Sequence, residues 1–589
     1  MSKLLTQTLF ALAFLGLAQG LIAQSPMNCA ASVPVAPNIR QEGISELVGD
    51  ILITCTGGTP ITSGTLPTIN LAMFLSTSVT SRVLVASTPP LIETLLFIDD
   101  PSPLVQSACV TRPCNFNDNV FQGQSLQFNS VNFNNIPVNP PGPNGQRVLR
   151  IKNLRVNASQ LPVNTGVLAF ISLSGNNLGS LNNAQQTVAY TKQGLITEQR
   201  NLTDTAYFGA GPGSSFVACT GNNIDLATNL AGQYTTPGGR SFLLKFSEPS
   251  GFGSAWKRRN IATSLSSPTA LGQQDSPSVA YTTESGYYNA NLPLTNNLRG
   301  SGLADSGTRL RVQFTNIPAG VRIYVTTREV TSGSTAIGSN TTTHAALTNP
   351  TGPFNAVTPD SSADGGLKLI GPTGEAVWEI LDTDTANAET VAFGVVVAFT
   401  SNPQPLAGLI NAGGSFSPTS VTTFSSSSEP VPRFLVPNPP IMFTSFSINA
   451  CHTTLLFQFV TNQAGFDTGV AVSNTTKDIL SSSPQTGKCT ATFFPTPASS
   501  SAQYPPLSTT GSLPAGEQWT FNVSSQRPGF QGYMMVGCDF QFAHGYAFIS
   551  DFGSTRLAQG YQAMVLPERP RMADPMSTSV AGSGEQLGQ

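Results

Sequence analysis

The chain has 589 residues, and 28 Lys and Arg against 31 Asp and Glu leave a formal net charge of −3 at neutral pH. Charged residues make up only 10% of the sequence, compared with about 25% in typical soluble domains, and no basic stripe indicates nucleic-acid binding. With 39% hydrophobic residues, a disordered chain is excluded, and the length predicts roughly three or four domains.

The N-terminal segment 1–23 has the pattern of a secretory signal peptide. Lys3 precedes an apolar run at Leu9–Leu17, small residues at Ala18 and Gly20 offer one cleavage position, and a second candidate lies after Ala23. The longest later apolar run, 391–399, has about half the length that a membrane helix needs. We therefore expect a secreted protein, extracellular or at the cell surface, without a membrane span.

Beyond that segment, apolar residues alternate with polar ones or form short blocks broken by Gly, Pro, Asn and Asp. This pattern predicts an all-β fold of tandem β-sandwich domains, immunoglobulin-like or jelly-roll-like, with little helix. One stretch, 247–259, could instead form a short helix, because Phe252 and Trp256 lie four positions apart. The predicted strands include 50–55, 147–151, 167–173, 309–314, 321–325, 376–381 and 390–399.

Composition indicates where the domains meet. The Ser/Pro-rich stretch 425–440 has linker chemistry, and the polar stretch 201–213 marks another break. Whether the similar stretches 131–137 and 312–318 reflect a duplication stays open. The breaks predict an N-terminal β-sandwich domain at 24–205, a middle β domain at 206–430, a C-terminal β-sandwich module at 431–568 and a flexible tail at 569–589.

All 8 cysteines lie beyond the signal segment. An even number in an exported chain predicts disulfides rather than a thiolate metal site. Cys489 and Cys538 both lie on strand-like runs and are the expected pair, with Cys451 as a competing partner for Cys538. The disulfide candidates are Cys29, Cys55, Cys109, Cys114, Cys489 and Cys538, and Cys219 and Cys451 are left unassigned.

The stretch 529–553 places Cys538, His544 and two aspartates close together in sequence. The even-numbered residues of 533–548 are mostly large and apolar, which predicts one strand with that face in the core. On one strand Cys538 and His544 lie about 20 Å apart, whereas a thiolate–imidazole pair needs hydrogen-bond reach. The alternative, a turn at 543–545, leaves His544 at its tip and Cys538 well below. We therefore expect Cys538 to be half of a disulfide and His544 to be a turn or rim residue.

Four stretches of the C-terminal part and two of the N-terminal part are distinctive sequence motifs. They are 451–469, 470–475, 529–533 and 540–551, together with 49–58 and 151–159. They resemble uncharacterised exported multidomain β proteins of soil bacteria, especially of the acidobacterial kind, a group without an established activity. The resemblance implies a bacterial, secreted and modular protein, and it implies no catalytic residue.

Two pairs of aspartates have the alternate-oxygen spacing of calcium loops. They are Asp360 with Asp364, and Asp382 with Asp384. Neither pair matches the EF-hand spacing, and the alternative interpretation is that these residues form ordinary Asx turns. Calcium is the only cofactor that the sequence suggests.

Trp256 is the candidate for stacking on a sugar, with Tyr287 and Tyr288 further along the chain. Trp256 is followed by three basic residues, 257–259, in a Gly/Ser context. The alternative interpretation is a packed aromatic ring whose neighbouring cations extend to solvent.

No nucleophile motif accompanies these features. There is no G-x-S-x-G sequence, and His344, His452 and His544 lie in unrelated contexts, so we expect no catalytic residues. The sequence favours a secreted, non-enzymatic structural, adhesive, cell-surface or matrix protein that associates with itself or with cell-wall or extracellular glycan. The alternative is a carbohydrate-binding protein or a polysaccharide-acting enzyme.

Overall fold

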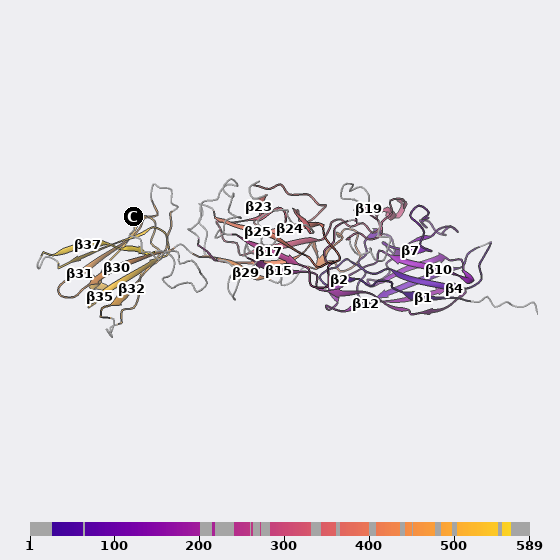
Figure 1. Cartoon of the computed structure of the whole chain (residues 1–589), viewed down its shortest axis with the longest axis horizontal. Coiled ribbons are helices and arrows are strands. Elements are labelled where there is room, and N and C mark those ends of the chain that lie inside the picture. The colour runs from indigo at the N-terminus through magenta and orange to yellow at the C-terminus, as the bar shows by residue number, and fades with distance from the viewer. Residues whose placement is uncertain are drawn as a thin grey trace, which may run out of the picture.

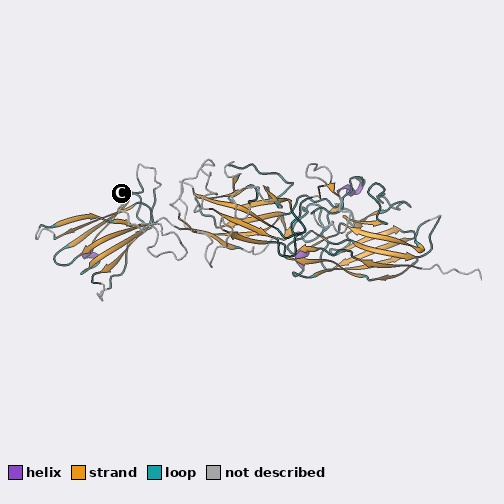
Figure 2. Cartoon of the chain, viewed as in Figure 1, coloured by secondary structure: helices purple, strands orange, loops and turns teal. Residues whose placement is uncertain are grey.

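Strands dominate the computed structural model, and Figure 2 shows only a few short helical turns. The fold is therefore all-β, as the sequence predicts. None of the helices in the described ranges is long and apolar enough to span a bilayer. The helical elements include η1 (Ala158–Gln160), η3 (Thr295–Gly300) and α2 (Val523–Gln526). The structure describes residues 26–62, 65–200, 215–217, 241–259, 261–262, 271–272, 283–330, 343–360, 366–399, 408–435, 442–449, 452–477, 484–497, 503–551 and 556–566.

The expected signal peptide 1–23 and tail 569–589 lie outside these ranges.

The N-terminal strands form one 12-stranded sheet with the order β13-β1-β4-β10-β7-β8-β9-β5-β12-β14-β2, and β6 pairs with β7. Buried side chains from well-separated positions of this order, such as Ile53, Met73 and Phe133, pack into one core. The sheet therefore curls back on itself. Its strands are β1 (Met27–Ser32), β2 (Asn38–Arg40), β4 (Ile51–Gly57), β5 (Thr68–Leu75), β6 (Val83–Val85), β7 (Leu91–Ile98), β8 (Val120–Gln124), β9 (Ser130–Pro137), β10 (Gly142–Lys152), β12 (Gly166–Gly175), β13 (Leu178–Asn182) and β14 (Gln185–Lys192), and a separate pair joins β3 (Glu46–Leu47) to β11 (Arg155–Val156).

Two sheets pack face to face in the middle region, with the orders β15-β17-β25-β21-β23 and β16-β29-β26-β20-β24-β22. Trp378 on β24 stacks on Phe393 of β25 at a ring-centroid distance of 4.0 Å and donates its indole N–H to the Thr326 carbonyl on β21 at 2.9 Å. These contacts join the two sheets across one core, as in a β-sandwich. The strands are β15 (Ile196–Arg200), β16 (Ser215–Val217), β17 (Ser241–Ser247), β20 (Arg309–Thr315), β21 (Val321–Thr326), β22 (His344–Thr348), β23 (Leu367–Leu369), β24 (Glu375–Asp382), β25 (Thr390–Phe399), β26 (Gly408–Ser417) and β29 (Phe443–Asn449), and two short pairs join β18 (Ile261–Ala262) to β19 (Leu271–Gly272) and β27 (Thr419–Ser420) to β28 (Phe434–Leu435).

The stretch 247–259 forms no helix. Turns and bends follow β17 there, and Gly251 adopts a positive φ of 79° that breaks a helical path. Glu248 Oε1 accepts the Trp256 backbone N–H at 2.7 Å. A buried carboxylate therefore satisfies the backbone of this loop in place of helical hydrogen bonds.

Strand pairing groups two segments differently from the boundaries expected at 205/206 and 430/431. β15 precedes the first of these boundaries, but it pairs with β17 of the middle region. β29 follows the second, but it pairs with β26. Composition marks polar stretches, whereas a strand joins the sheet that satisfies its backbone hydrogen-bonding groups.

Two segments from the middle of the sequence pack against the N-terminal sheet. In 283–308, Leu292 and Leu298 are buried against Phe97 of β7. In 419–435, Phe434 forms a β-bridge with Gly43. The N-terminal and middle sheets accordingly lie next to each other in Figure 1, and the first part of the expected linker 425–440 belongs to the joint between them.

The C-terminal module is a smaller pair of sheets with the orders β33-β32-β35-β30-β38 and β34-β31-β36-β37. Both sheets contribute to a single core. The strands are β30 (Thr453–Thr461), β31 (Asp467–Asn474), β32 (Cys489–Pro495), β33 (Leu507–Ser508), β34 (Gln518–Asn522), β35 (Gln531–Cys538), β36 (Ala543–Ser550), β37 (Ala558–Gln562) and β38 (Met564–Leu566).

The single strand expected over 533–548 is wrong, because the chain crosses there from β35 in one sheet to β36 in the other. Even-numbered residues are buried on β35, whereas odd-numbered residues are buried on β36. Phe542, with a φ of 57°, lies in the crossing where this phase changes. His544, Tyr546 and Phe548 are consequently exposed rather than facing the core.

Candidate functional site

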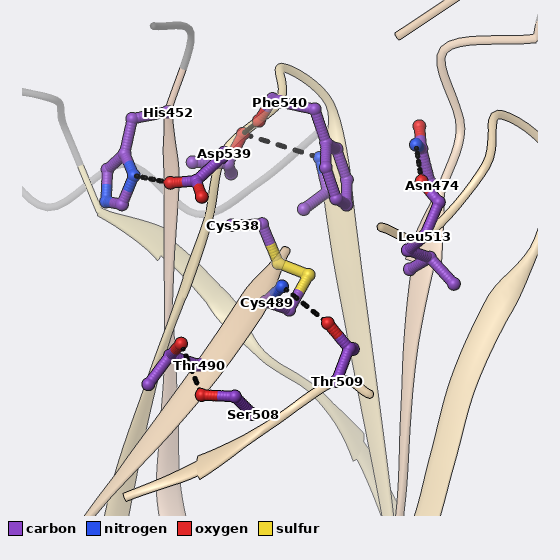
Figure 3. Close-up of a disulfide and its surroundings, with 12 residues drawn as sticks. His452, Asn474, Cys489, Thr490, Ser508, Thr509, Leu513, Cys538, Asp539 and Phe540 are labelled. Carbon is purple, nitrogen blue, oxygen red and sulfur yellow. Dashed lines mark hydrogen bonds and ion pairs between the residues drawn. A yellow bond between two sulfur atoms is a disulfide. The ribbon is translucent and has the colours of Figure 1, made fainter. Parts of the chain in front are cut away.

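Cys538 forms a disulfide with Cys489, the pair that the strand pattern predicts. The two residues lie directly opposite each other on β35 and β32, and both side chains are fully buried. Figure 3 shows the disulfide together with Thr509, whose Oγ1 accepts the Cys489 N–H at 3.3 Å. The sulfur atoms therefore connect neighbouring strands, and Cys538 is not a nucleophile.

The histidines near Cys538 do not complete a catalytic site. His452 Nδ1 lies 3.9 Å from Asp539 Oδ1, in a pair whose side chains are 48% and 59% exposed (Figure 3). His544 is exposed on β36, where it lies opposite Ser473. Cys538 is bridged and buried, and His544 is exposed on a strand of the other sheet. This stretch therefore offers no thiolate–imidazole chemistry.

Two further disulfides are present among the other candidates. Cys29 and Cys55 connect β1 to β4, and Cys109 and Cys114 close a short loop. Asp118 lies within ligand distance of the second pair, but sulfurs bonded to each other are not metal ligands. The described ranges contain no free cysteine, and Cys219 and Cys451 lie outside them.

The calcium candidates that the structure describes interact with local partners. Asp360 pairs with Lys368 at 2.6 Å, and Asp382 pairs with Arg258 at 2.9 Å. Asp384 accepts the Ala386 backbone N–H at 3.0 Å, which is an Asx-turn contact. Asp364 lies outside the described ranges.

Two of the three sugar-stacking candidates are packing residues. Trp256 is fully buried in the middle core. Tyr287 is also buried, with its ring edge-to-face against Phe97 at a centroid distance of 5.1 Å, because the segment 283–308 packs against the N-terminal sheet. Neither ring presents a face to solvent, and Tyr288 is half-buried. The assignment of Trp256 and Tyr287 to a glycan surface is therefore corrected, and that of Tyr288 stays a prediction.

A group of buried charges lies at the joint between the N-terminal sheet and the middle region. Arg40, at the end of β2, donates to the two carboxylate oxygens of Glu284 at 2.7 and 3.0 Å and to Glu46 Oε1 at 2.9 Å. It also donates to Thr308 Oγ1 at 2.9 Å, and its guanidinium lies 4.7 Å from the Phe434 ring centroid. The four polar side chains are at most 2% exposed. Every strong donor of Arg40 is therefore used within the protein.

Arg155 extends this group from the same side of the joint. It donates to the Glu284 carbonyl oxygen at 2.6 Å and to Glu93 Oε1 at 3.2 Å, and Glu93 Oε2 accepts the Gly302 N–H at 3.1 Å. We call the five charged residues the interdomain charge cluster. Its members are Arg40, Glu46, Glu93, Arg155 and Glu284.

Attraction between opposite charges keeps Arg40 and Glu284 charged despite their burial. Burial by itself lowers the pKa of Arg40, but Glu284 and Glu46 outweigh this effect and raise that pKa above its usual value. Burial by itself raises the pKa of Glu284, but the charge and hydrogen bonds of Arg40 outweigh it and lower that pKa. Neighbouring Lys257 is also buried, and burial lowers its pKa. The cluster thus acts as an ionic lock whose members depend on one another.

Sequence reasoning missed this cluster because its members are far apart in the chain. Arg40 and Glu284 are separated by 244 positions. The sequence indicates buried charges only indirectly. Charged residues are rare in it, and Arg40 and Glu46 lie close to short apolar stretches. Such a pattern does not reveal which distant charge completes a pair.

A second candidate site is the outer face of the four-stranded sheet in the C-terminal module. Tyr546 and Phe548 on β36 are 47% and 46% exposed. A hollow of about 460 Å³ lies beside them, a volume within the range of small-ligand sites. We call this surface the β31 hollow, which is lined by Gly469, Val470, Ala471, Thr520, Phe521, Asn522, Tyr546 and Phe548.

No protein-family model and no curated protein matches this sequence. Among solved structures, the chain is similar to a protein titled BspA_C_mut, at 6% identity and a TM-score of 0.24, over 70% of this chain and 99% of that chain. It is also similar to the serine-rich repeat adhesion glycoprotein Srr1 from Streptococcus agalactiae, at 8% identity and a TM-score of 0.15, over 72% and 96% of the two chains. A third is the major pilin subunit BcpA of Bacillus cereus, at 5% identity and a TM-score of 0.19, over 84% and 96%. At such low TM-scores these similarities carry no argument about this chain.

Proposed function

We propose that this protein is a non-enzymatic structural element of the cell surface or extracellular matrix, in which the N-terminal and middle regions act as one stiff unit. The observation that carries the proposal is the interdomain charge cluster. Arg40 and Arg155 of the N-terminal part both bond Glu284 from the middle part of the sequence. A stiff connection between β-sandwiches suits a spacer that holds its ends apart.

The energetics of buried charges support stiffness at this joint. Removing one partner of a buried ion pair costs about 3–5 kcal/mol, and opening the joint would separate several partners at once. Apolar contacts add to this cost, since Leu292 and Leu298 would leave the side chains of Phe97 and Leu95. Hinge motion between the two regions is therefore strongly disfavoured.

The cysteines support an extracellular setting and a structural role. The described cysteines are all bridged, and disulfides persist mainly in oxidising compartments. His344, which lies on β22, is bonded to Glu329 at 2.9 Å, and His452 and His544 lie on separate surfaces. These contacts favour stability over nucleophilic chemistry.

Small-angle scattering of the purified full chain tests the stiff unit, and fractionation of the producing cells and their medium tests the location. We expect wild-type scattering to fit one rigid N-terminal and middle body, and the Glu284→Ala variant to scatter as a broader, hinged ensemble. Recovery of the protein from the cytosol, or free hinge motion in the wild type, would contradict the proposal.

A further inference from the structure

The β31 hollow lies on the face of a sheet, not at its edge. β31 pairs with β34 on one side and with β36 on the other. Its backbone hydrogen-bonding groups are therefore used within the sheet. A peptide that binds by adding a strand needs a free edge, so a ligand in this hollow must be recognised by side chains.

Register explains the shape of the hollow. Gly469 lies between Asn522 and Phe548, and Ala471 lies between Thr520 and Tyr546. The central strand thus supplies a floor without bulky side chains, with aromatic rings along one side and polar side chains along the other. A Cβ atom at Gly469 would meet nothing closer than Asn522 Oδ1 at 3.5 Å, so the space above the floor is open.

The aromatic side of the hollow is built to stack on a flat ligand. Tyr546 and Phe548 are two positions apart on one strand, which places them about 7 Å apart on the same face. A Cβ atom at Gly560 of β37 would collide with the Tyr546 hydroxyl. The tyrosine ring therefore leans across β37, on the side of β36 away from β31, and extends the aromatic border of the hollow in that direction. Both rings are about half exposed, and each presents an apolar surface to solvent.

The opposite side of the hollow offers hydrogen bonds without charge. No residue of the lining is charged. The Asn522 carboxamide makes no capping hydrogen bond to α2, and within the described ranges neither it nor the Thr520 hydroxyl has a side-chain partner. The lining therefore offers no partner for an ionised ligand, and it suits a neutral one that carries both apolar faces and hydroxyl or carbonyl groups.

We propose that the β31 hollow binds an uncharged polysaccharide. Phe548 stacks on the C–H face of a sugar ring, Tyr546 contacts the next sugar along the rim, and Thr520 and Asn522 bond the sugar hydroxyls. A second copy of the chain fits less well, because a dry protein interface would bury the Thr520 and Asn522 side chains without partners, at a cost in free energy. This inference goes beyond the proposed structural role and does not depend on it, since it rests on a different part of the molecule.

Affinity electrophoresis of the full chain tests the proposal, in gels that contain a neutral β-glucan, a mannan or a xylan, with alginate as the anionic comparison. We expect at least one neutral polymer to retard the protein. The Phe548→Ala variant should bind about tenfold more weakly, since a stacked ring contributes roughly one factor of ten. Phe459→Ala, which removes a similarly exposed ring from β30, should bind like the wild type.

A second variant tests the hollow without removing a side chain, so that a loss of packing cannot explain its effect. Gly469 has no positive φ, and its position has room for a side chain. Gly469→Val therefore fills the hollow without backbone strain and should abolish retardation while leaving the thermal melting curve unchanged.

Equal mobility in every neutral gel would overturn the proposal, as would retardation that Gly469→Val does not change. Stronger retention by alginate than by any neutral polymer would also overturn it. Concentration-dependent self-association that Tyr546→Ala removes would assign the surface to a second copy. None of these results changes the scattering expected for the stiff unit, so the two proposals fail separately.

Discussion

The joint between the N-terminal and middle regions and the C-terminal module are stabilised by opposite means. The joint buries charges whose positions are as much as 244 residues apart. The module packs an apolar core around a disulfide between residues 49 positions apart. A buried charge without its partner is strongly unfavourable, whereas apolar contacts are lost one group at a time. A single substitution at the joint should therefore cause a large loss of stability, whereas single substitutions in the core of the module should each cause a smaller one.

The largest expected effect is at the joint. Glu284→Ala leaves Arg40 without its bidentate partner in a fully buried position. We expect the free energy of unfolding of the N-terminal and middle unit to fall by about 3–5 kcal/mol. Denaturant unfolding followed by tryptophan fluorescence measures this loss, because Trp256 and Trp378 lie in the middle core.

A surface pair provides the control for that prediction. Arg147 and Asp99 form an ion pair whose side chains are 32% and 38% exposed. Arg147→Ala should cost less than about 1 kcal/mol. If the two variants lose similar stability, the charges at the joint do not act as a lock.

The next effect separates the module from the joint. Replacing Cys489 and Cys538 together by serine opens a loop with a sequence separation of 49, and chain entropy predicts a loss of about 4 kcal/mol. Calorimetry should show one transition moving to lower temperature while the transition of the N-terminal and middle unit stays in place. Opening the Cys109–Cys114 loop, with a separation of 5, should cost only about 2 kcal/mol and should affect the other transition.

The third prediction concerns how the stability of the N-terminal and middle unit depends on pH, because a titrating carboxyl group, Glu248, lies beside the joint. Glu248 accepts the Trp256 N–H at 2.7 Å, and the neighbouring Ala255 carbonyl accepts from Arg40 at 3.1 Å. Burial, together with the charge of Glu389, raises the pKa of Glu248 from 4.5 to about 7. The folded state thus binds a proton that the unfolded state releases above its ordinary pKa, so this contribution is complete below pH 4.5 and is lost as the pH rises through 7.

The melting temperature of the N-terminal and middle unit should accordingly fall between pH 5 and pH 8, by an amount equivalent to about 1.4 kcal/mol per unit of pKa shift at most. Glu248→Gln should flatten this dependence. A profile that is equally steep in both proteins would show that other groups cause it.

The smallest expected effect is at the crossing between the sheets of the module. Phe542 is about half exposed and has a φ of 57°, a conformation that costs a non-glycine residue about 1–2 kcal/mol. Glycine relieves this strain but has a more disordered unfolded state, so Phe542→Gly should stabilise the module by only about 0.5 kcal/mol. A loss of more than 1 kcal/mol in urea unfolding would show that the Phe542 ring contributes packing there.

The sequence predicted these regions unequally. The sequence pattern placed a strand at 376–381 and paired Cys489 with Cys538, and both features are present. It placed Tyr546 and Phe548 on the wrong side, because the chain changes sheets between β35 and β36 and the buried positions change there from even to odd. It also left Trp256 as a surface candidate, since the contacts that bury this ring come from strands on both sides of it in the sequence.

Composition and local periodicity alone established a β-strand chain with paired cysteines, because alternation and turn residues act over only a few positions. The three-dimensional fold decided which charges meet at the joint and which sheet face is left uncovered. Both depend on contacts between segments that are distant in the chain. The polarity of a side chain is known from the sequence, whereas the partner that buries it is known only from the tertiary structure.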